Sequence, residues 1–154
     1  MRRRKWPLAA RRGTIALVGL LAVPGLTGCS AVEVAVPPLA TRPPCPSMGW
    51  PQQVAGHERV DVTPDSPASA AWGDPAIIAR CGVPAPPPTT LECIGVDDVD
   101  WVVEQLSDGQ RFTTYGRDPA LQVLVPNAYS PEPLVLGAFT PAARTLPATG
   151  RRCR

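Results

Sequence analysis

Short apolar runs separated by turn residues dominate the chain from residue 70 onward. The run Ala76–Cys81 stands between Gly-Asp-Pro and Gly-Val-Pro, flanks that are typical of a buried strand. Runs at 99–106 and 110–116 flank Asp108-Gly109, a dipeptide favoured in tight hairpin turns, whose central residues need positive φ. The run Ala120–Pro126 ends in proline and predicts one more strand. Together these runs predict an antiparallel sheet.

Helical signals are fewer and short. Ser130-Pro131-Glu132 combines an N-cap residue, a proline at the first helical position and an acid in the first turn. It leads into the apolar segment 134–139, which stops at Pro141, and residues 47–56 predict another short helix. The expected fold class is therefore α+β: a small antiparallel sheet of three to five strands with short helices.

The beginning of the chain has a different pattern. Residues 1–12 are rich in basic side chains, Thr14–Val23 is strongly apolar, and helix-breaking Pro24-Gly25 follows. Leu26-Thr27-Gly28-Cys29 then resembles the lipobox of bacterial lipoproteins, in which the cysteine thiol carries a diacylglyceryl group and the chain is cut just before it. Two alternatives stay open. Residues 13–32 are uncharged and long enough for a retained membrane span, and the cysteine could follow an ordinary signal peptide by chance.

The lipobox interpretation divides the chain into three parts. Residues 1–28 are the signal peptide, 29–44 a lipid-anchored, proline-rich tether and 45–154 a small disulfide-containing α+β domain. The diacylglyceryl group on Cys29 would hold the protein at the outer face of the cytoplasmic membrane, because two acyl chains anchor stably. Arg3-Arg4 loosely resembles a twin-arginine signal, so the export route stays open between Sec and Tat.

Charge changes sign along the chain. Six of the 15 basic residues precede the apolar run, whereas all 13 acidic residues follow it. Without its first 28 residues the chain has nine arginines and no lysine, and its net charge is about −4. An acidic, lysine-free domain is a poor partner for phosphate backbones, so nucleic acid is not an expected partner.

Four cysteines remain besides Cys29, and in an exported chain they predict two disulfides. Of the three pairings, we favour Cys81–Cys93, which brackets a proline-rich loop, together with Cys45–Cys153, which ties the two ends of the domain. A zinc site is the rival use of four cysteines, but no pair shows C-x-x-C spacing.

Candidate chemistry is sparse, and we expect no cofactor, metal or catalytic residue. His57 is the single histidine, on a polar stretch without a Gly-x-Ser-x-Gly elbow nearby. The acidic cluster of Asp97, Asp98 and Asp100 lacks the alternating ligand frame of a calcium loop, so we expect a solvated turn or edge. Three tryptophans are expected to anchor the core: Trp50, Trp72 and Trp101.

Three segments resemble a known family when taken together. They are "AAWGDPAIIARCGVP" at 70–84, "GVDDVDWV" at 95–102 and "TTYGRDPALQVLVP" at 113–126. The chain is similar there to exported actinobacterial lipoproteins grouped as domain of unknown function 3515, over about residues 45–147 and the lipobox. The resemblance implies a location in the cell envelope and supplies no activity and no catalytic residues.

The function expected from these observations is that of a lipid-anchored, non-catalytic envelope protein that binds another envelope protein or a wall component. The proposed interaction surface consists of Trp72, Asp74, Tyr115 and Arg117, at expected strand ends. The competing explanation of these residues is that they only build turns. Two other functions stay open, a small envelope hydrolase acting on a wall component and a carrier of a small ligand.

Overall fold

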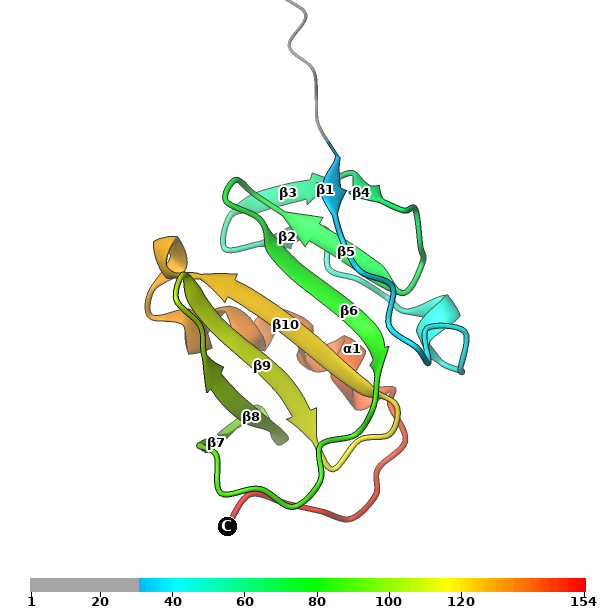
Figure 1. Cartoon of the computed structure of the whole chain (residues 1–154), viewed down its shortest axis with the longest axis vertical. Coiled ribbons are helices and arrows are strands. Elements are labelled where there is room, and N and C mark those ends of the chain that lie inside the picture. The colour runs from blue at the N-terminus through cyan, green and yellow to red at the C-terminus, as the bar shows by residue number, and fades with distance from the viewer. Residues whose placement is uncertain (1–30) are drawn as a thin grey trace, which may run out of the picture.

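The computed structural model describes residues 31–154, and its main element is an eight-stranded antiparallel sheet (Figure 1). The strand order is β2-β3-β5-β6-β10-β9-β8-β7. In that order the bounds are Gln53–Val54, His57–Val60, Ser69–Trp72, Ile77–Val83, Ala120–Pro126, Gly109–Tyr115, Val99–Gln105 and Cys93–Val96. A parallel pair, β1 (Val32–Glu33) and β4 (Val62–Thr63), forms a second small sheet. The chain is therefore mostly β, and the expected α+β class with three to five strands is wrong.

The centre of the sheet is formed by the strands that the apolar runs predicted. They are β6, β10 and the β8–β9 hairpin, whose ladder runs from Asp100 opposite Tyr115 to Gln105 opposite Gln110. The strands that the pattern did not predict lie at the two sides. All of β3 is exposed and all of β5 is buried, so neither shows the alternation of period two that marks a half-buried strand. Because this alternation is missing, the sequence pattern did not reveal these strands, and the expected number of strands was too small.

The turns also differ in part from expectation. The hairpin at Asp108-Gly109 exists, with the Leu106 N–H donating to the Gly109 carbonyl oxygen at 2.9 Å. Successive positive φ values lie elsewhere, at Ala55 (50°) and Gly56 (81°) in the β2–β3 turn and at Asp97 (47°) and Asp98 (63°) in the β7–β8 turn. Two successive left-handed residues are what a two-residue hairpin loop needs, and aspartate tolerates that conformation better than most residues.

One face of the sheet carries the core. Short helices cover it from behind in the view of Figure 1: η3 (Glu132–Phe139), a 3-10 helix, and α1 (Thr140–Arg144). Trp72 is fully buried there, edge-on to Trp50 at 6.3 Å and to Phe139 at 5.3 Å between ring centroids. Trp101 is also fully buried. The expectation that the three tryptophans anchor the core is confirmed.

The helix predicted after Pro131 lies where it was expected, but most of it is not an α-helix. Pro131 precedes η3, and helical residues continue from Glu132 to Arg144, yet only α1 is an α-helix. Gly137 lies in the interior of η3, where a glycine weakens an α-helix by about 1 kcal/mol. The stretch 47–56, expected to be helical, instead contains strand β2 after the 3-10 turn η1 (Cys45–Ser47).

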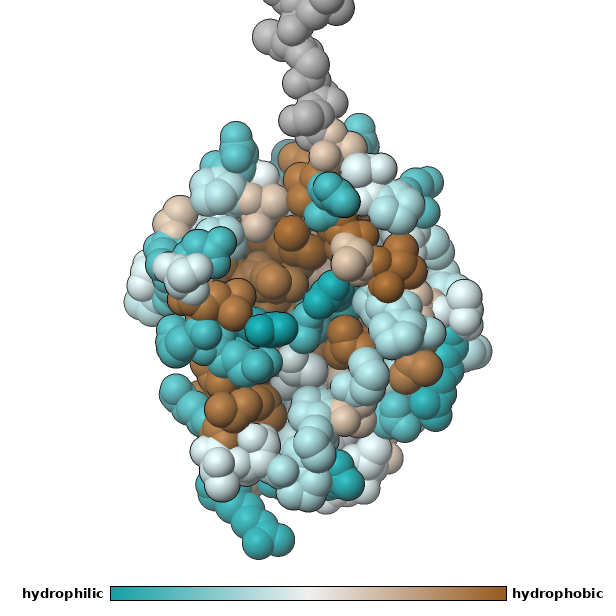
Figure 2. Space-filling model, viewed as in Figure 1, coloured by the Kyte–Doolittle hydropathy of each residue, from teal (hydrophilic) through white to brown (hydrophobic). Residues whose placement is uncertain are grey.

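The opposite face of the sheet, called the open face here, is crossed by the N-terminal segment (Figure 1). On it Arg80 donates to the Gln122 side chain at 2.6 Å and to the Ala35 carbonyl oxygen at 3.2 Å. Figure 2 shows apolar surface around this crossing. Val36 of the N-terminal segment is 47% exposed, and Val60 of β3 is 38% exposed. The open face is therefore partly covered by the chain's own N-terminal residues.

The prediction of an extended tether over residues 29–44 is wrong for its described part, 31–44. The Val34 N–H donates to the Thr63 carbonyl oxygen and the Leu39 N–H to the Gly82 carbonyl oxygen, each at 2.9 Å. Gly82 has φ of +103°, and a Cβ there would collide with the backbone of Ala40. Prolines without N–H groups suggested an unpaired chain, but the residues between them carry the pairing. The domain therefore begins before Cys45.

Candidate functional site

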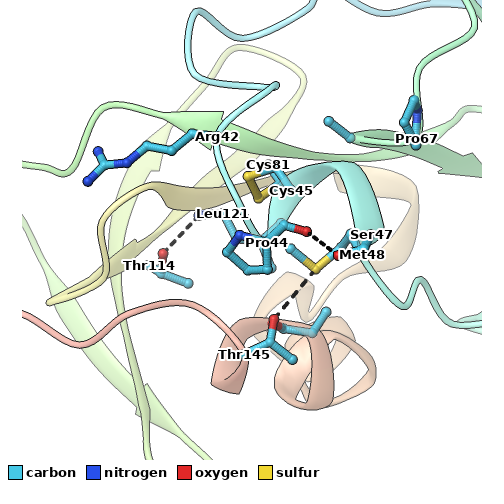
Figure 3. The surroundings of a disulfide bond; sticks show 12 residues. Arg42, Pro44, Cys45, Ser47, Met48, Pro67, Cys81, Thr114, Leu121 and Thr145 are labelled. Carbon is cyan, nitrogen blue, oxygen red and sulfur yellow. Dashed lines mark hydrogen bonds between the residues drawn. A yellow bond between two sulfur atoms is a disulfide. The ribbon is translucent and has the colours of Figure 1, made fainter.

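The four cysteines of the described residues form two disulfides, as the cysteine count predicted, but the favoured pairing is wrong. Cys45 pairs with Cys81, with 5.3 Å between their Cα atoms, and Cys93 pairs with Cys153, with 5.6 Å. Figure 3 shows the first of these, where η1 brings Cys45 onto strand β6. Both cysteines of this pair are fully buried in the core.

Strand order excludes the favoured pairing. Cys81 lies on β6 and Cys93 on β7, and three strands separate them in the sheet. With about 4.8 Å between neighbouring strands, their Cα atoms are on the order of 19 Å apart. A disulfide needs Cα atoms within about 7 Å. The proline-rich loop between them thus spans the sheet instead of closing a small ring.

The expected lipidation site, Cys29, lies outside the described residues. The expected interaction surface of Trp72, Asp74, Tyr115 and Arg117 is not one surface. Asp74 follows β5 and Arg117 follows β9, and the antiparallel register puts these two turns at opposite ends of the sheet (Figure 1). Trp72 is a core residue, with its indole N–H donating to the Pro51 carbonyl oxygen at 3.1 Å.

The end of the sheet that carries Asp74 holds a small polar and aromatic cluster. The rings of His57 and Tyr129 lie edge to face, 5.4 Å apart, and the Tyr129 hydroxyl donates to the Pro75 carbonyl oxygen at 2.8 Å. Burial raises the pKa of the Tyr129 phenol, and the nearby Asp74 carboxylate raises it further. A shallow hollow of about 310 Å³ adjoins Tyr129, and Leu134 on its rim is 79% exposed.

His57 does not line this hollow, nor the larger one described below. The histidine is exposed on β3, at the end of the sheet away from Tyr115. A hydrolase acting through His57 needs a cleft that contains it, together with a nucleophile. His57 lines neither of the two described hollows, so neither one brings it together with a nucleophile.

The acidic cluster lies at the β7–β8 turn, as expected for a solvated turn, and has structural partners. The side chain of Asp98 is 93% exposed and lies 3.4 Å from Arg144. Asp100 accepts the backbone N–H of Cys153 at 2.9 Å, which ties the C-terminal segment to β8. Within residues 31–154, no three histidine, cysteine or acidic side chains group as metal ligands.

A larger cavity, of about 890 Å³, opens at the Tyr115 end of the sheet. We call it the arginine cleft. Its walls are the end of the β6–β7 loop with the first residue of β7 (88–93), Tyr115 of β9, and the C-terminal segment 150–154. The Cys93–Cys153 disulfide joins two of these walls, so the covalent bond is part of the site.

Backbone contacts hold the C-terminal wall in place. The Arg117 guanidinium donates to the Leu146 carbonyl oxygen at 2.8 Å, and the Thr149 N–H donates to the Gly116 carbonyl oxygen at 2.9 Å. Gly116 has φ of +75°, and a Cβ there would collide with the carbonyl oxygen of Arg151. Arg117, expected as a binding residue, therefore positions the wall of the cleft.

Charge sets the arginine cleft apart from the rest of the domain. Three arginines line it, at 151, 152 and 154, against one acid, Glu92. Arg151 donates to the Pro86 carbonyl oxygen at 3.1 Å, and among the described residues neither it nor Arg154 lies within 4.0 Å of a carboxylate. A carbonyl oxygen accepts a hydrogen bond without cancelling the charge, so the cleft stays cationic.

The family of the chain follows from comparison with known proteins. A sequence profile described as "Protein of unknown function (DUF3515)" matches residues 13–149. The chain belongs to this family. The DUF3515 assignment confirms the resemblance carried by the Trp-Gly-Asp-Pro, Val-Asp-Trp and Tyr-Gly-Arg segments. No curated protein and no solved structure matches the chain.

The DUF3515 assignment names no functional site, so the choice of the arginine cleft as the candidate site is based on the geometry of the structure alone. Sequence reasoning missed it because Arg151, Arg152 and Arg154 follow the segments of the resemblance, and Cys153 among them was interpreted only as a disulfide partner. A signal was present: three of the nine arginines after residue 28 fall within four positions. What the sequence did not show is that the β6–β7 loop and Tyr115 face them. No helix among residues 31–154 is long and apolar enough to span a bilayer.

Proposed function

We propose that this chain is a lipid-anchored protein of the cell envelope whose β-domain is a non-catalytic binding module, with the arginine cleft as its binding site. Cys29 in its lipobox-like sequence is the proposed point of lipidation. The oxidised state of the other four cysteines supports an extracytoplasmic location, because disulfides form and persist in oxidising compartments.

The cleft is the observation that carries the binding part of the proposal. Its volume of about 890 Å³ falls in the range of ligand sites, which is about 300–1,000 Å³. It is lined by Tyr115, which combines an aromatic ring with a hydroxyl, and by side chains with unpaired donors. A disulfide across its walls limits the conformations of the free site, which lowers the entropic cost of binding.

The packed N-terminal segment determines how an anchored domain would sit. Residue 31 already belongs to the domain, so Cys29 is two positions from it, a reach of about 7 Å at full extension. The lipid would therefore hold the β1 end of the domain close to the bilayer. The chain's C-terminal end lies at the opposite pole from β1 (Figure 1), so the arginine cleft would face away from the membrane.

The anchor is tested by replacing its thiol. The Cys29→Ser variant should lose lipid labelling and processing and leave the membrane fraction on mild extraction, whereas the Cys93→Ser variant should keep both. A Cys29→Ser protein that is processed and retained like the parent would show that the anchor is wrong.

The binding site is tested by crosslinking in intact cells. A photo-reactive residue placed at Thr90, exposed in the wall of the cleft, should capture an envelope component. The same residue at Asp65, exposed on the β4–β5 loop, is the matched control and should capture little. Equal capture from both positions, or none from Thr90, would contradict a binding site in the cleft.

A further inference from the structure

The arginine cleft has a ligand chemistry, and this inference rests on the function proposed above. We infer that the cleft binds a polymer of phosphate esters, taking up consecutive phosphate groups with Arg151, Arg152 and Arg154. The wall of the envelope, and not the bilayer that holds the protein, is the inferred source of these phosphates.

Electrostatics supports an anionic ligand. The described residues carry 13 acids and nine arginines, so the domain as a whole repels anions. The cleft reverses this locally, since three arginines line it and only one acidic side chain does, that of Glu92. Arg152 lies 4.0 Å from Asp100, and its side chain is 67% exposed, so it keeps most of its surface for a ligand. A cationic cleft on an acidic domain attracts an anion to that one place.

The hydrogen-bonding geometry of arginine suits phosphate groups. A guanidinium has five N–H donors in a planar fork that matches two oxygens of a phosphate. Arg151 and Arg152 each use donors on backbone carbonyl oxygens, Pro86 at 3.1 Å and Asp98 at 3.2 Å. Each bond fixes one donor of the guanidinium while further donors remain for a ligand, which lowers the entropic cost of ordering these two arginines on binding.

Size and position favour a polymer away from the bilayer. A cavity of about 890 Å³ is larger than one phosphate group, and its three arginines offer room for successive charges along a chain. The cleft lies at the pole opposite β1, which the anchored Cys29 would hold at the membrane. Phosphate headgroups of the protein's own bilayer are then out of its reach.

Binding of defined polyanions to the purified full chain, held in a neutral detergent, tests this inference by calorimetry. The probes are an oligomer of glycerol phosphate, a carboxylate polymer of similar charge density (polygalacturonate), and vesicles of phosphatidylcholine with phosphatidylglycerol. We expect the phosphate oligomer to bind, with an affinity that falls as the salt concentration rises. The other two probes should bind at least tenfold more weakly. Equal binding of polygalacturonate would overturn the phosphate assignment, and equal binding of the vesicles would overturn the wall as its source.

Substitutions of the lining arginines test whether the phosphate oligomer binds in the cleft. Arg154→Ala should lower the affinity for the phosphate oligomer about tenfold, the loss expected for a charge-assisted hydrogen bond. The double variant, Arg151→Ala with Arg154→Ala, should lower it about a hundredfold. Arg154→Lys should recover part of the loss. Arg59→Ala removes an equally exposed arginine on β3 and should change nothing. Each variant is accepted only with both disulfides closed, as shown by mass mapping. A loss of the same size in Arg59→Ala would overturn the site.

The experiments distinguish a failure of the proposed binding function from a failure of the phosphate assignment. If Thr90 crosslinks to an envelope component in cells but the phosphate oligomer does not bind in solution, the ligand chemistry is wrong and the binding function stands. If neither is seen, both are wrong.

Discussion

The two disulfides of this domain are the same bond in opposite surroundings. Cys45–Cys81 lies in the core, with neither residue exposed, and joins the N-terminal segment to the central strand β6. Cys93–Cys153 lies in the wall of the arginine cleft and joins the edge strand β7 to the exposed C-terminal segment. One is packed as part of the fold, and the other shapes a hollow on its surface.

The comparison separates two contributions to a disulfide's effect on stability. By chain entropy alone, loops of 36 and 60 residues predict about 3.8 and 4.3 kcal/mol, so the cleft disulfide should stabilise more. Burial predicts the reverse order, because removing the core disulfide also leaves a cavity. The C-terminal segment, in contrast, can detach while the rest of the sheet stays folded. We expect burial to decide the order.

The largest effect is expected from the core disulfide. Cys45→Ala with Cys81→Ala should lower the free energy of unfolding by about 5 kcal/mol, because a crosslink and buried sulfur atoms are lost together. Urea unfolding, followed by tryptophan fluorescence, measures it. A loss below that of the Cys93→Ala, Cys153→Ala protein would contradict the comparison.

Native-state reduction should distinguish the two bonds by rate. A small dithiol reaches Cys93–Cys153 through the cleft, but it reaches Cys45–Cys81 only after the core opens. The core bond should therefore react on the order of 1,000-fold more slowly. Alkylation at timed intervals and mass mapping give both rates. Similar rates would show that the core opens as readily as the cleft.

Two glycines extend the comparison to the chain segments that the disulfides hold. Gly82→Ala should destabilise by about 3 kcal/mol, because the left-handed backbone and the packed Ala40 backbone both resist a Cβ. Gly116→Ala should cost about 1 kcal/mol, because the Arg151 backbone that it meets lies in an exposed segment and can yield more easily than the backbone packed at Gly82. Thermal unfolding of the two variants, with exposed Gly49→Ala as a control, measures the difference.

The cleft disulfide is expected to contribute less to stability than the core disulfide. Cys93→Ala with Cys153→Ala should cost about 2 kcal/mol of unfolding free energy, less than loop entropy predicts, because the C-terminal segment gains freedom in the folded state too. The freed segment should be cut by trypsin after Arg151 and Arg152 under native conditions, while the parent resists. Equal resistance of the variant would show that hydrogen bonds alone hold the wall.

The chain's own pattern was sufficient for the middle of the sheet. Strands β6, β8, β9 and β10, each seven residues long, lie on runs of six to eight residues that turn signals bound, so the sequence pattern was enough to predict them. Strands β2 and β3 lie on no such run. Two and four mostly exposed residues form them because neighbouring strands supply hydrogen-bond partners.

The candidate site was harder to predict than the fold. Tyr115 and Arg117 were selected as binding residues from their place at a strand end, and one of them does line the cleft. Asp74 and Trp72 were grouped with them because they too were expected at a strand end. Antiparallel register separates the two groups by the length of the strands, and register is a long-range property.

The sequence by itself determined the family, the central strands, the burial of Trp50, Trp72 and Trp101, and the oxidation of the four cysteines after Cys29 into two disulfides. Each of these depends on residue types and local spacing. Only the tertiary structure decided which cysteines pair, that the N-terminal segment packs on the sheet, and that three arginines face Tyr115 across a cleft. Those contacts join residues tens of positions apart, and the order of strands in the sheet, which no local pattern encodes, brings them together.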